Sequence, residues 1–193
     1  MRRMDFINQT GWTDFVPVVD DDAARFLQLI LQIKRPKNIL EIGTSIGFSA
    51  VTMALTARQY GGNITTIEFD KTAAEHADMN FKRSGVDDII PIELGDARQI
   101  VPGFSGNSFG LIFQDVSKRL YPVLLKDCIR ILKAGGVFMT DDALFPVMEL
   151  DPKYHDQVEP ICEFNRLVAA SKDLESTLLP IGDGIMVAVK KQQ

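Results

Sequence analysis

The chain has 193 residues, of which 46% are hydrophobic and 24% charged, values typical of a single soluble globular domain. They exclude a disordered tail, a collagen-like fibre and a small disulfide scaffold. No apolar run reaches the roughly 18 to 20 residues that a membrane helix needs. A net charge of -5 disfavours broad binding to nucleic acid or to anionic membranes. With two cysteines and no signal-peptide pattern, we expect a cytoplasmic protein.

The first half of the sequence alternates between helical and extended patterns. Apolar residues at helical spacing predict a helix over 22–34, with the acids 20–22 at its start and Pro36 after its end. Further along the chain, the pattern predicts a strand over 38–42, a helix over 47–60, a strand over 64–68, a helix over 71–84 and a strand over 89–94. This rhythm is typical of a parallel sheet that helices cover on both faces.

The second half continues the alternation and then changes. The pattern predicts a strand over 109–114, a helix over 118–133, a strand over 137–140, a helix over 161–171 and strands over 175–180 and 185–190. Gly182-Asp183-Gly184 between the last two strands indicates an antiparallel hairpin. We therefore expect one α/β domain over 1–193, with residues 1–37 as a short N-terminal helical cap.

A glycine-rich turn follows the first predicted strand, in Glu41-Ile42-Gly43-Thr44-Ser45-Ile46-Gly47. Glycines let the backbone approach a ligand closely, and the helix after the turn offers free N–H groups to an anion. The spacing differs from the dinucleotide fingerprint G-x-G-x-x-G. On its own the turn is equally compatible with an ordinary strand-to-helix connection.

Acids stand at the ends of the next two predicted strands. Glu68 ends the second and Asp96 follows the third. Ligands of open α/β sheets bind at the carboxyl ends of the strands, where an acid can accept both hydroxyls of a ribose. Together with the glycine turn, these two acids predict a nucleoside site.

A second acidic group follows the fourth and fifth strands. Asp115 has Lys118 one helical turn beyond it, and Asp141 and Asp142 are adjacent. Three converging carboxylates repel one another unless a positive charge sits among them. Oxygen ligands suit a hard divalent cation, Mg²⁺ first, with Ca²⁺ or Mn²⁺ as alternatives. The other interpretation is that some of these acids are helix caps that face water.

These motifs resemble the S-adenosylmethionine-dependent, metal-dependent O-methyltransferases, the catechol and caffeoyl-CoA enzymes and their bacterial relatives. The resemblance rests on ILEIGTSIGFSA, TIEFD, the D-x-x-K at 115–118, TDDALF at 140–145 and LLPIGDG at 178–184. It extends over about residues 26–190. It implies the seven-stranded Rossmann-like class I methyltransferase fold, a mostly parallel sheet with a C-terminal antiparallel hairpin.

The resemblance implies a set of residues that bind S-adenosylmethionine. In this sequence they are Glu41, Gly43, Gly47, Ser49, Glu68, Phe69, Asp96, Ala97 and Asp115. Of these, Glu41 and the two glycines would shape the loop, and Ser49 would hold the methionine carboxylate. Glu68 would bind the ribose hydroxyls and Phe69 would lie against the adenosine, unless Phe69 is a plain core aromatic. Asp96 and the Ala97 backbone would read the adenine edge.

The resemblance also assigns the chemistry. Asp115, Asp141 and Asp142 become metal ligands and Lys118 the general base, with its pKa lowered by the metal. Relatives usually have Asn where this chain has Asp142, so rate and metal preference are open. The expected reaction is metal-assisted methyl transfer to a hydroxyl of a small acceptor, catechol-like or of the hydroxycinnamoyl type. Two alternatives stay open: a tRNA 5-hydroxyuridine O-methyltransferase and a non-catalytic S-adenosylmethionine-binding protein.

Other residues receive weaker assignments. His76 is expected on a solvated surface, His155 in a loop without a metal, and Cys128 in the core. Arg119 and Tyr121 flank the predicted base and are assigned either a surface role or contact with substrate. Trp12 and Phe15 are assigned to a pocket cap or to the anchor of a homodimer, an assembly with which the sequence is compatible.

Overall fold

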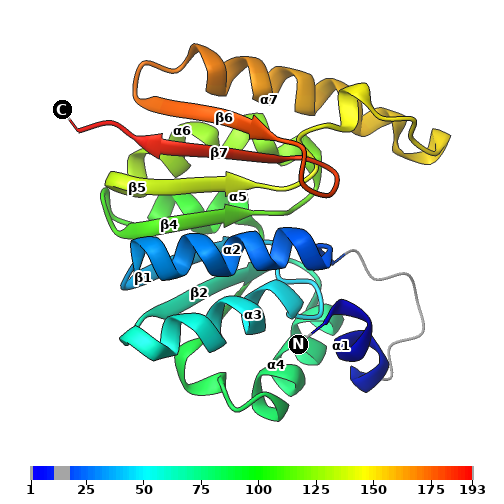
Figure 1. Cartoon of the computed structure of the whole chain (residues 1–193), viewed down its shortest axis with the longest axis vertical. Helices are drawn as coiled ribbons and strands as arrows, with labels where there is room; N and C mark the ends of the chain where they lie inside the picture. Colours follow the sequence, from blue (N-terminus) through cyan, green and yellow to red (C-terminus); the bar gives the residue numbers. More distant parts are fainter. Residues whose placement is uncertain (1, 11–17, 193) are drawn as a thin grey trace. The chain divides into compact units, whose positions relative to one another are not determined.

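A computed structural model of the chain describes residues 2–10 and 18–192 (Figure 1). The chain divides after Ala97 into two compact units, residues 1–97 and 98–193. Each unit is described separately below. The assignment of 1–193 to a single domain with a helical cap over 1–37 stays a prediction.

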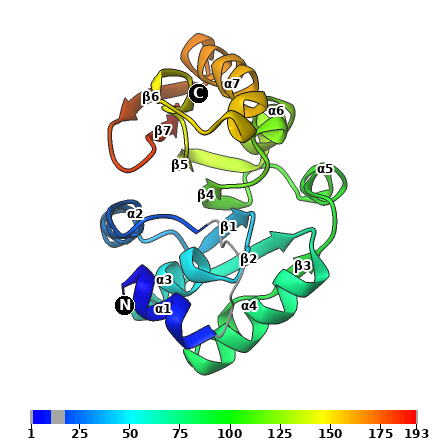
Figure 2. The same ribbon diagram turned by 90° about the vertical axis from the view of Figure 1, so that its right-hand side faces the viewer.

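Unit 1 contains three parallel strands in the order β3-β2-β1. Its elements are α1 (Arg3–Thr10), α2 (Asp21–Lys34), β1 (Asn38–Ile42), α3 (Phe48–Ala57), β2 (Asn63–Glu68), α4 (Lys71–Arg83) and β3 (Ile92–Leu94), with 3-10 turns at Arg58–Tyr60 and Asp87–Ile89. Helix α2 packs against α3, and both α3 and α4 contact β2 (Figure 2). The carboxyl ends of β1, β2 and β3 therefore lie at one edge of this unit.

The start of α2 confirms the expected N-cap. The Asp20 carboxylate accepts hydrogen bonds from the backbone N–H groups of Asp22 and Ala23, at 3.0 and 2.9 Å. Such a cap satisfies donors that have no partner within the helix. The helix then buries one apolar face through Leu27 and Leu31.

Unit 2 contains four strands in the order β4-β5-β7-β6. The short helix α5 (Ala97–Ile100) leads into it. Its further elements are β4 (Phe109–Gln114), α6 (Tyr121–Ile131), β5 (Leu132–Thr140), α7 (Val158–Ala170), β6 (Leu174–Leu179) and β7 (Ile185–Lys190), with 3-10 turns at Val101–Gly103, Lys118–Leu120, Phe145–Val147 and Pro152–Gln157. Strands β4 and β5 are parallel, whereas β7 is antiparallel to both β5 and β6.

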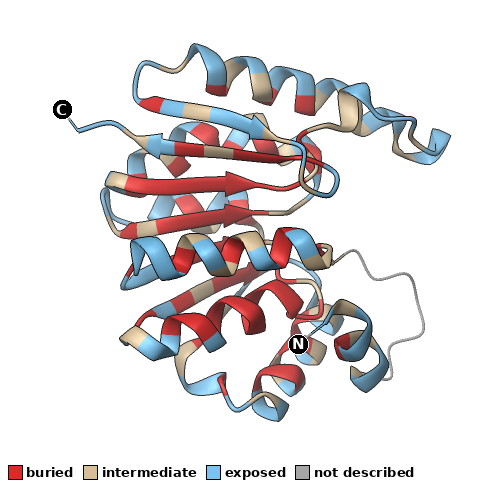
Figure 3. Ribbon diagram, viewed as in Figure 1, coloured by how far each residue is buried: buried red, intermediate tan, exposed pale blue. Residues whose placement is uncertain are grey.

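The core of unit 2 lies under α6 and α7, which pack against each other. Burial concentrates in β4 and in the second half of β5, and the outward side of α7 is exposed (Figure 3). The Phe164 ring meets Tyr121 and Phe138 edge-on, with centroids 5.2 and 6.1 Å apart. This aromatic cluster fixes the start of α6 beside the strand ends.

The predicted fold class is confirmed. Across residues 2–10 and 18–192 there are seven strands, mostly in parallel pairs, and the last two form an antiparallel hairpin. Within the same ranges, no helix has the length and apolar character to cross a membrane.

The turn of this hairpin holds the loop that follows β5. The backbone N–H groups of Ala143 and Leu144 donate to the carbonyls of Gly184 and Asp183, at 2.8 and 3.0 Å. Gly184 has φ +96°, and a Cβ there would lie 2.6 Å from the Leu144 nitrogen. Only glycine fits this position without strain. The hairpin therefore positions the segment immediately after Asp141 and Asp142.

Candidate active site

The glycine turn of unit 1 is a tight loop between β1 and α3. The Gly43 N–H donates to the Ile67 carbonyl of β2 at 3.0 Å, which holds the loop to the neighbouring strand. Gly47 has φ +88°, and a Cβ there would lie 2.5 Å from the Phe81 ring of α4. The first turn of α3 thus packs closely against α4 because residue 47 has no side chain.

Below this loop lies a buried polar group. Glu41 is completely buried, and its Oε2 accepts a hydrogen bond from Thr66 Oγ1 at 2.5 Å. Thr66 Oγ1 lies 2.6 Å from Thr44 Oγ1 of the loop. These contacts tie the end of β1 to β2 and to the loop; the role of Glu41 in cofactor binding stays a prediction.

Glu68 sits at the end of β2 and accepts four backbone hydrogen bonds. Its Oε2 takes the N–H groups of Thr44 and Ser45, at 3.1 and 2.7 Å, and its Oε1 takes those of Phe69 and Asp70, both at 2.9 Å. The carboxylate therefore fastens the glycine loop to the strand end. Ribose hydroxyls that bind here have to share or displace some of these amides.

The other predicted cofactor residues of unit 1 differ in their exposure. Phe69 is 76% exposed, so the alternative of a core aromatic is wrong. Ser49 and Ala97 are buried in the first turns of α3 and α5, and Asp96 is half-buried after β3. An exposed aromatic ring directly after Glu68 is a surface on which an adenine can stack. The roles of these residues stay predictions, as does the assignment of Asp115, in unit 2, to the cofactor.

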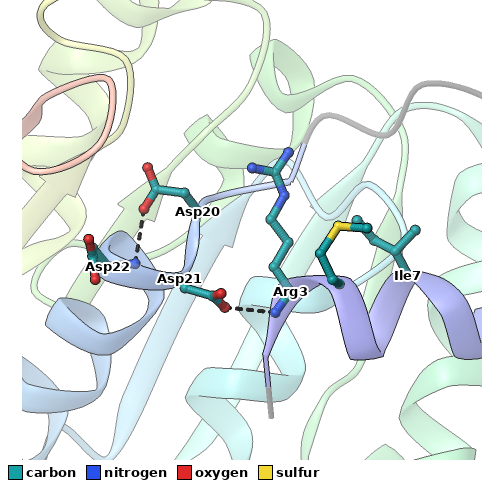
Figure 4. A pocket seen from close by; sticks show the side chains of 6 residues that line it. Arg3, Ile7, Asp20, Asp21 and Asp22 are labelled. Atoms are coloured by element: carbon teal, nitrogen blue, oxygen red, sulfur yellow. Dashed lines mark hydrogen bonds between the residues drawn. The ribbon is translucent and has the colours of Figure 1, made fainter.

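A hollow of about 450 Å³ opens between α1 and the start of α2. Its lining residues are Arg3, Met4, Ile7, Asp20, Asp21 and Asp22. Figure 4 shows the two bonds that occupy its acids: Asp21 Oδ1 accepts the Arg3 N–H at 2.7 Å, and Asp20 caps α2. The Asp21 carboxylate thus joins the start of α1 to the start of α2.

In unit 2, Lys118 lies among the predicted metal ligands. Its ammonium is 2.8 Å from Asp115 Oδ1 and 2.5 Å from Asp142 Oδ2, and the lysine is 7% exposed. Asp141 is also buried, and its Oδ1 accepts the Asp142 N–H at 2.9 Å. Asp142 adopts the left-handed region with φ 58°, where Asp and Asn are among the few tolerated residues. The ends of β4 and β5 thus place two carboxylates in contact with one buried ammonium and a third, that of Asp141, beside Asp142.

Burial and mutual repulsion shift the pKa values of this cluster upward. Burial raises the pKa of Asp141 well above its usual range, and the charges of Asp115 and Asp142 add to the shift. Burial also raises the pKa of Asp142 to about 6, although the Lys118 ammonium opposes this. Burial alone would lower the pKa of Lys118, but Asp115, Tyr121 and Asp142 raise it well above its usual value. With these contacts in place, Lys118 carries its proton at neutral pH.

Tyr121 also belongs to this cluster, although its place beside the predicted base indicated only a surface role or contact with substrate. It is completely buried, so a surface role is wrong. Its hydroxyl lies 3.1 Å from the Lys118 ammonium and bonds to the Gln114 and Asp141 carbonyls at 3.1 and 3.2 Å. The sequence signal that could have placed Tyr121 beside Lys118 is their spacing of three residues, because residues three apart lie on one side of a helix.

The donor chemistry of the cluster fits a divalent cation. The Lys118 ammonium contacts two of the three carboxylates, and repulsion among the acids adds to the burial that raises the pKa values of Asp141 and Asp142. Carboxylate oxygens are the ligands that Mg²⁺, Ca²⁺ and Mn²⁺ take. Within the described ranges, however, no three His, Cys, Asp or Glu side chains are arranged as a complete ligand set. Metal binding therefore stays a prediction.

The remaining assignments have mixed outcomes. Cys128 is completely buried, as predicted. His76 is half-buried on α4, and His155 Nε2 lies 3.2 Å from the Leu150 carbonyl. Arg119 is exposed and pairs with Asp156 at 2.7 Å. Trp12 and Phe15 lie outside the described residues.

The pKa of Asp142 makes stability depend on pH. Its folded-state value of about 6 exceeds the ordinary 3.8, so the folded chain holds this proton more tightly than the unfolded chain does. Ionisation of Asp142 therefore removes stability as pH rises from about 4 to 6, by about 2 to 3 kcal/mol. Asparagine fits the same backbone conformation. We therefore expect the free energy of unfolding of Asp142→Asn, relative to wild type, to increase by that amount between pH 4 and pH 7.5.

Urea unfolding of both proteins at pH 4 and at pH 7.5 measures this gain. Glu163→Gln, at an exposed acid of α7 in the same unit, is the matched control and should show no such pH-dependent gain. An equal difference between Asp142→Asn and wild type at both pH values contradicts the assignment.

Comparison with known proteins identifies the family. The model of the O-methyltransferase family matches residues 6–191. A catechol O-methyltransferase of Niastella koreensis is 30% identical over 185 residues, which cover 90% of this chain and 82% of that protein. A caffeoyl-CoA O-methyltransferase of Populus kitakamiensis is 28% identical over 181 residues, 88% of this chain and 75% of that one.

A solved structure agrees with these relatives. The O-methyltransferase of Bacillus cereus, in complex with SAH, superposes with a TM-score of 0.83 at 26% identity and covers 97% of this chain and 90% of that one. The predicted resemblance and the predicted enzyme class are thereby confirmed. The chain belongs to the O-methyltransferase family.

Proposed function

We propose that this enzyme transfers a methyl group from S-adenosylmethionine to a hydroxyl of a small, catechol-like or hydroxycinnamoyl-type acceptor. Lys118 is the base and a divalent cation assists. The observation that carries the proposal is the buried Lys118 ammonium between Asp115 and Asp142, with Asp141 beside them. The catechol and caffeoyl-CoA enzymes among its relatives support the acceptor class.

The residues of unit 1 supply the donor side of the reaction. The loop at Gly43–Gly47 offers the N–H groups of the first turn of α3 to the methionine carboxylate, with Ser49 beside them. Glu68 accepts the ribose hydroxyls, and the exposed Phe69 ring stacks on the adenine.

The residues of unit 2 supply the acceptor side. Asp115, Asp141 and Asp142 would hold the divalent cation, Mg²⁺ in the first place. When bound, it would polarise the acceptor hydroxyl and offset the negative charge that keeps the proton on Lys118. Lys118, once it has released its own proton, takes the hydroxyl proton at its Nζ, and the acceptor oxygen bonds to the methyl group as S-adenosylhomocysteine leaves.

The test of the function is a transfer assay with labelled S-adenosylmethionine and Mg²⁺. The acceptor arms are catechols, hydroxycinnamoyl thioesters and tRNA that contains 5-hydroxyuridine. We expect label in a catechol or a hydroxycinnamoyl thioester. Label in tRNA alone replaces the proposed acceptor class, and cofactor binding without transfer to any arm supports a non-catalytic binding protein.

Removing the Phe69 ring should weaken cofactor binding without harming the fold. Phe69 is 76% exposed, so Phe69→Ala costs little folding energy. Stacking of a base on an aromatic side chain contributes about 1 to 3 kcal/mol, so we expect an affinity for S-adenosylmethionine that is about 5- to 100-fold lower. Isothermal titration measures it. Met79→Ala, which removes another exposed apolar side chain of unit 1, is the control. Equal affinities of Phe69→Ala and wild type reject the stacking role.

A further inference from the structure

The Lys118 ammonium has one acceptor for each of its three N–H groups. Two acceptors are carboxylate oxygens, Asp115 Oδ1 and Asp142 Oδ2, and the third is the hydroxyl oxygen of Tyr121 at 3.1 Å. A lysine side chain has four rotatable bonds, and its charged end has no fixed direction of its own. Three acceptors in different directions therefore define the position of Nζ.

Tyr121 differs from the two acids in how firmly it is itself held. Its hydroxyl contacts the carbonyls of Gln114 and Asp141, the residues at the ends of β4 and β5. The ring is completely buried, lies edge-on to Phe164 at 5.2 Å, and has the Lys118 ammonium 5.0 Å from its centroid. Asp115 and Asp142, by contrast, are partly exposed in the loops after the strands.

The Tyr121 hydroxyl therefore joins three parts of the site. It accepts from Lys118 and has its own hydrogen to share between the two carbonyls. A buried hydroxyl that connects two strand ends to a charged group keeps these groups in one arrangement. A phenylalanine would fill the same space with none of these bonds.

We propose that Tyr121 is a positioning residue that holds the Lys118 nitrogen in a fixed relation to the ends of β4 and β5. The proposal rests on the function of Lys118 proposed above. Tyr121 acts through Lys118, whose orientation toward the acceptor hydroxyl decides how often proton transfer occurs in the correct geometry.

The test compares Tyr121→Phe with Tyr60→Phe. Both variants remove one buried hydroxyl and keep the ring, but the Tyr60 hydroxyl has no hydrogen-bond partner among residues 2–10 and 18–192. Hydrogen bonds to charged groups contribute about 1.5 to 3 kcal/mol, so we expect kcat of Tyr121→Phe to fall about 10- to 100-fold. KM for S-adenosylmethionine should stay within about twofold, and Tyr60→Phe should keep the wild-type kcat.

A second readout does not depend on methyl transfer. Proton NMR of ¹⁵N-lysine protein detects a buried ammonium by its slow hydrogen exchange, and Lys118→Met assigns the signal. We expect exchange at Lys118 to be at least about tenfold faster in Tyr121→Phe, since one of three bonds is lost. Circular dichroism melts of all variants identify any general loss of structure.

The outcomes separate the two proposals. If hydrogen exchange at Lys118 is faster in Tyr121→Phe but the wild-type enzyme transfers no methyl group to any acceptor, the positioning role stands and the proposed function is rejected. Unchanged exchange and an unchanged kcat in a folded Tyr121→Phe overturn the positioning role. A parallel rise in KM for both substrates, with kcat unchanged, also overturns it.

Discussion

Replacing Lys118 should lower kcat by about 10² to 10⁴, the usual contribution of a general base. The side chain is buried at the ends of β4 and β5 and reaches Asp115, Asp142 and Tyr121. Lys118→Ala and Lys118→Met both remove its nitrogen, and Met also preserves most of the packing. Single-turnover transfer from labelled S-adenosylmethionine measures the loss.

Lys118→Arg tests whether Lys118 acts by accepting the acceptor proton or only by carrying a positive charge. Arginine stays protonated in proteins, so this variant keeps a cation beside the carboxylates but has no site that can take up the acceptor proton. We expect its rate to be as low as that of Lys118→Met. Cofactor affinity, measured by titration calorimetry, should stay within about twofold of wild type in all three variants.

Two results contradict this role. A folded Lys118→Met with an undiminished rate removes Lys118 from the reaction. A Lys118→Arg with the wild-type rate shows that the positive charge matters and that proton removal at this position does not. Removing the ammonium leaves Asp115 and Asp142 without this partner, so melting curves must accompany each rate.

Much of the fold could be predicted because buried strands appear in the sequence as short apolar runs. Strands β1, β4 and β7 begin and end at the predicted residues. Their side chains are mostly buried, so hydrophobic pattern and secondary structure agree. The end of α2 before Pro36 follows from proline geometry in the same way.

The strand β5 shows why some boundaries could not be predicted. Gly135-Gly136 is typical of a helix end, and the sequence analysis extended the preceding helix to residue 133. The structure ends α6 at Ile131 and starts β5 at Leu132. The pairing with β4 then shifts register, from Phe109 with Leu132 to Leu111 with Val137. A Cβ on Gly136 would lie 2.8 Å from atoms of Leu132 and Lys133. Glycine therefore occupies this position because the bulge leaves no room for a side chain.

The strand β3 is shorter than predicted for a related reason. The apolar run over 89–94 favours a strand, but Asp87–Ile89 form a 3-10 turn and β3 begins at Ile92. Pro91 lies between them and has no N–H to donate to a neighbouring strand. Its carbonyl does accept the Thr66 N–H, at 3.1 Å.

The candidate site could be predicted as far as strand ends and acids are concerned. Alternation places Glu68, Asp115 and Asp141 at carboxyl ends of strands, and that much depends on local sequence. The bonds that a side chain makes depend on tertiary packing. Neither the four amides on Glu68 nor the Tyr121 hydroxyl beside Lys118 leaves a periodic signal.

Removing divalent metal should reduce transfer to less than about one hundredth, because stabilising an ionised acceptor oxygen contributes several kcal/mol. Repulsion among Asp115, Asp141 and Asp142 adds to the burial that raises the pKa values of Asp141 and Asp142, and a bound cation would relieve this repulsion. We expect chelator-treated protein to recover with Mg²⁺, and Asp141→Asn to bind Mg²⁺ at least about tenfold more weakly than wild type.

Calorimetric titration with Mg²⁺ alone provides a readout that does not depend on activity. Glu163→Gln, which removes an exposed acid of α7 in unit 2, is the control and should bind like wild type. If chelated protein shows full transfer and no heat is detected on addition of Mg²⁺, Ca²⁺ or Mn²⁺, the Lys118 ammonium is itself the cation that Asp115 and Asp142 hold. The carboxylates would then act by fixing Lys118, and ionisation of the acceptor would depend on that lysine without help from a metal.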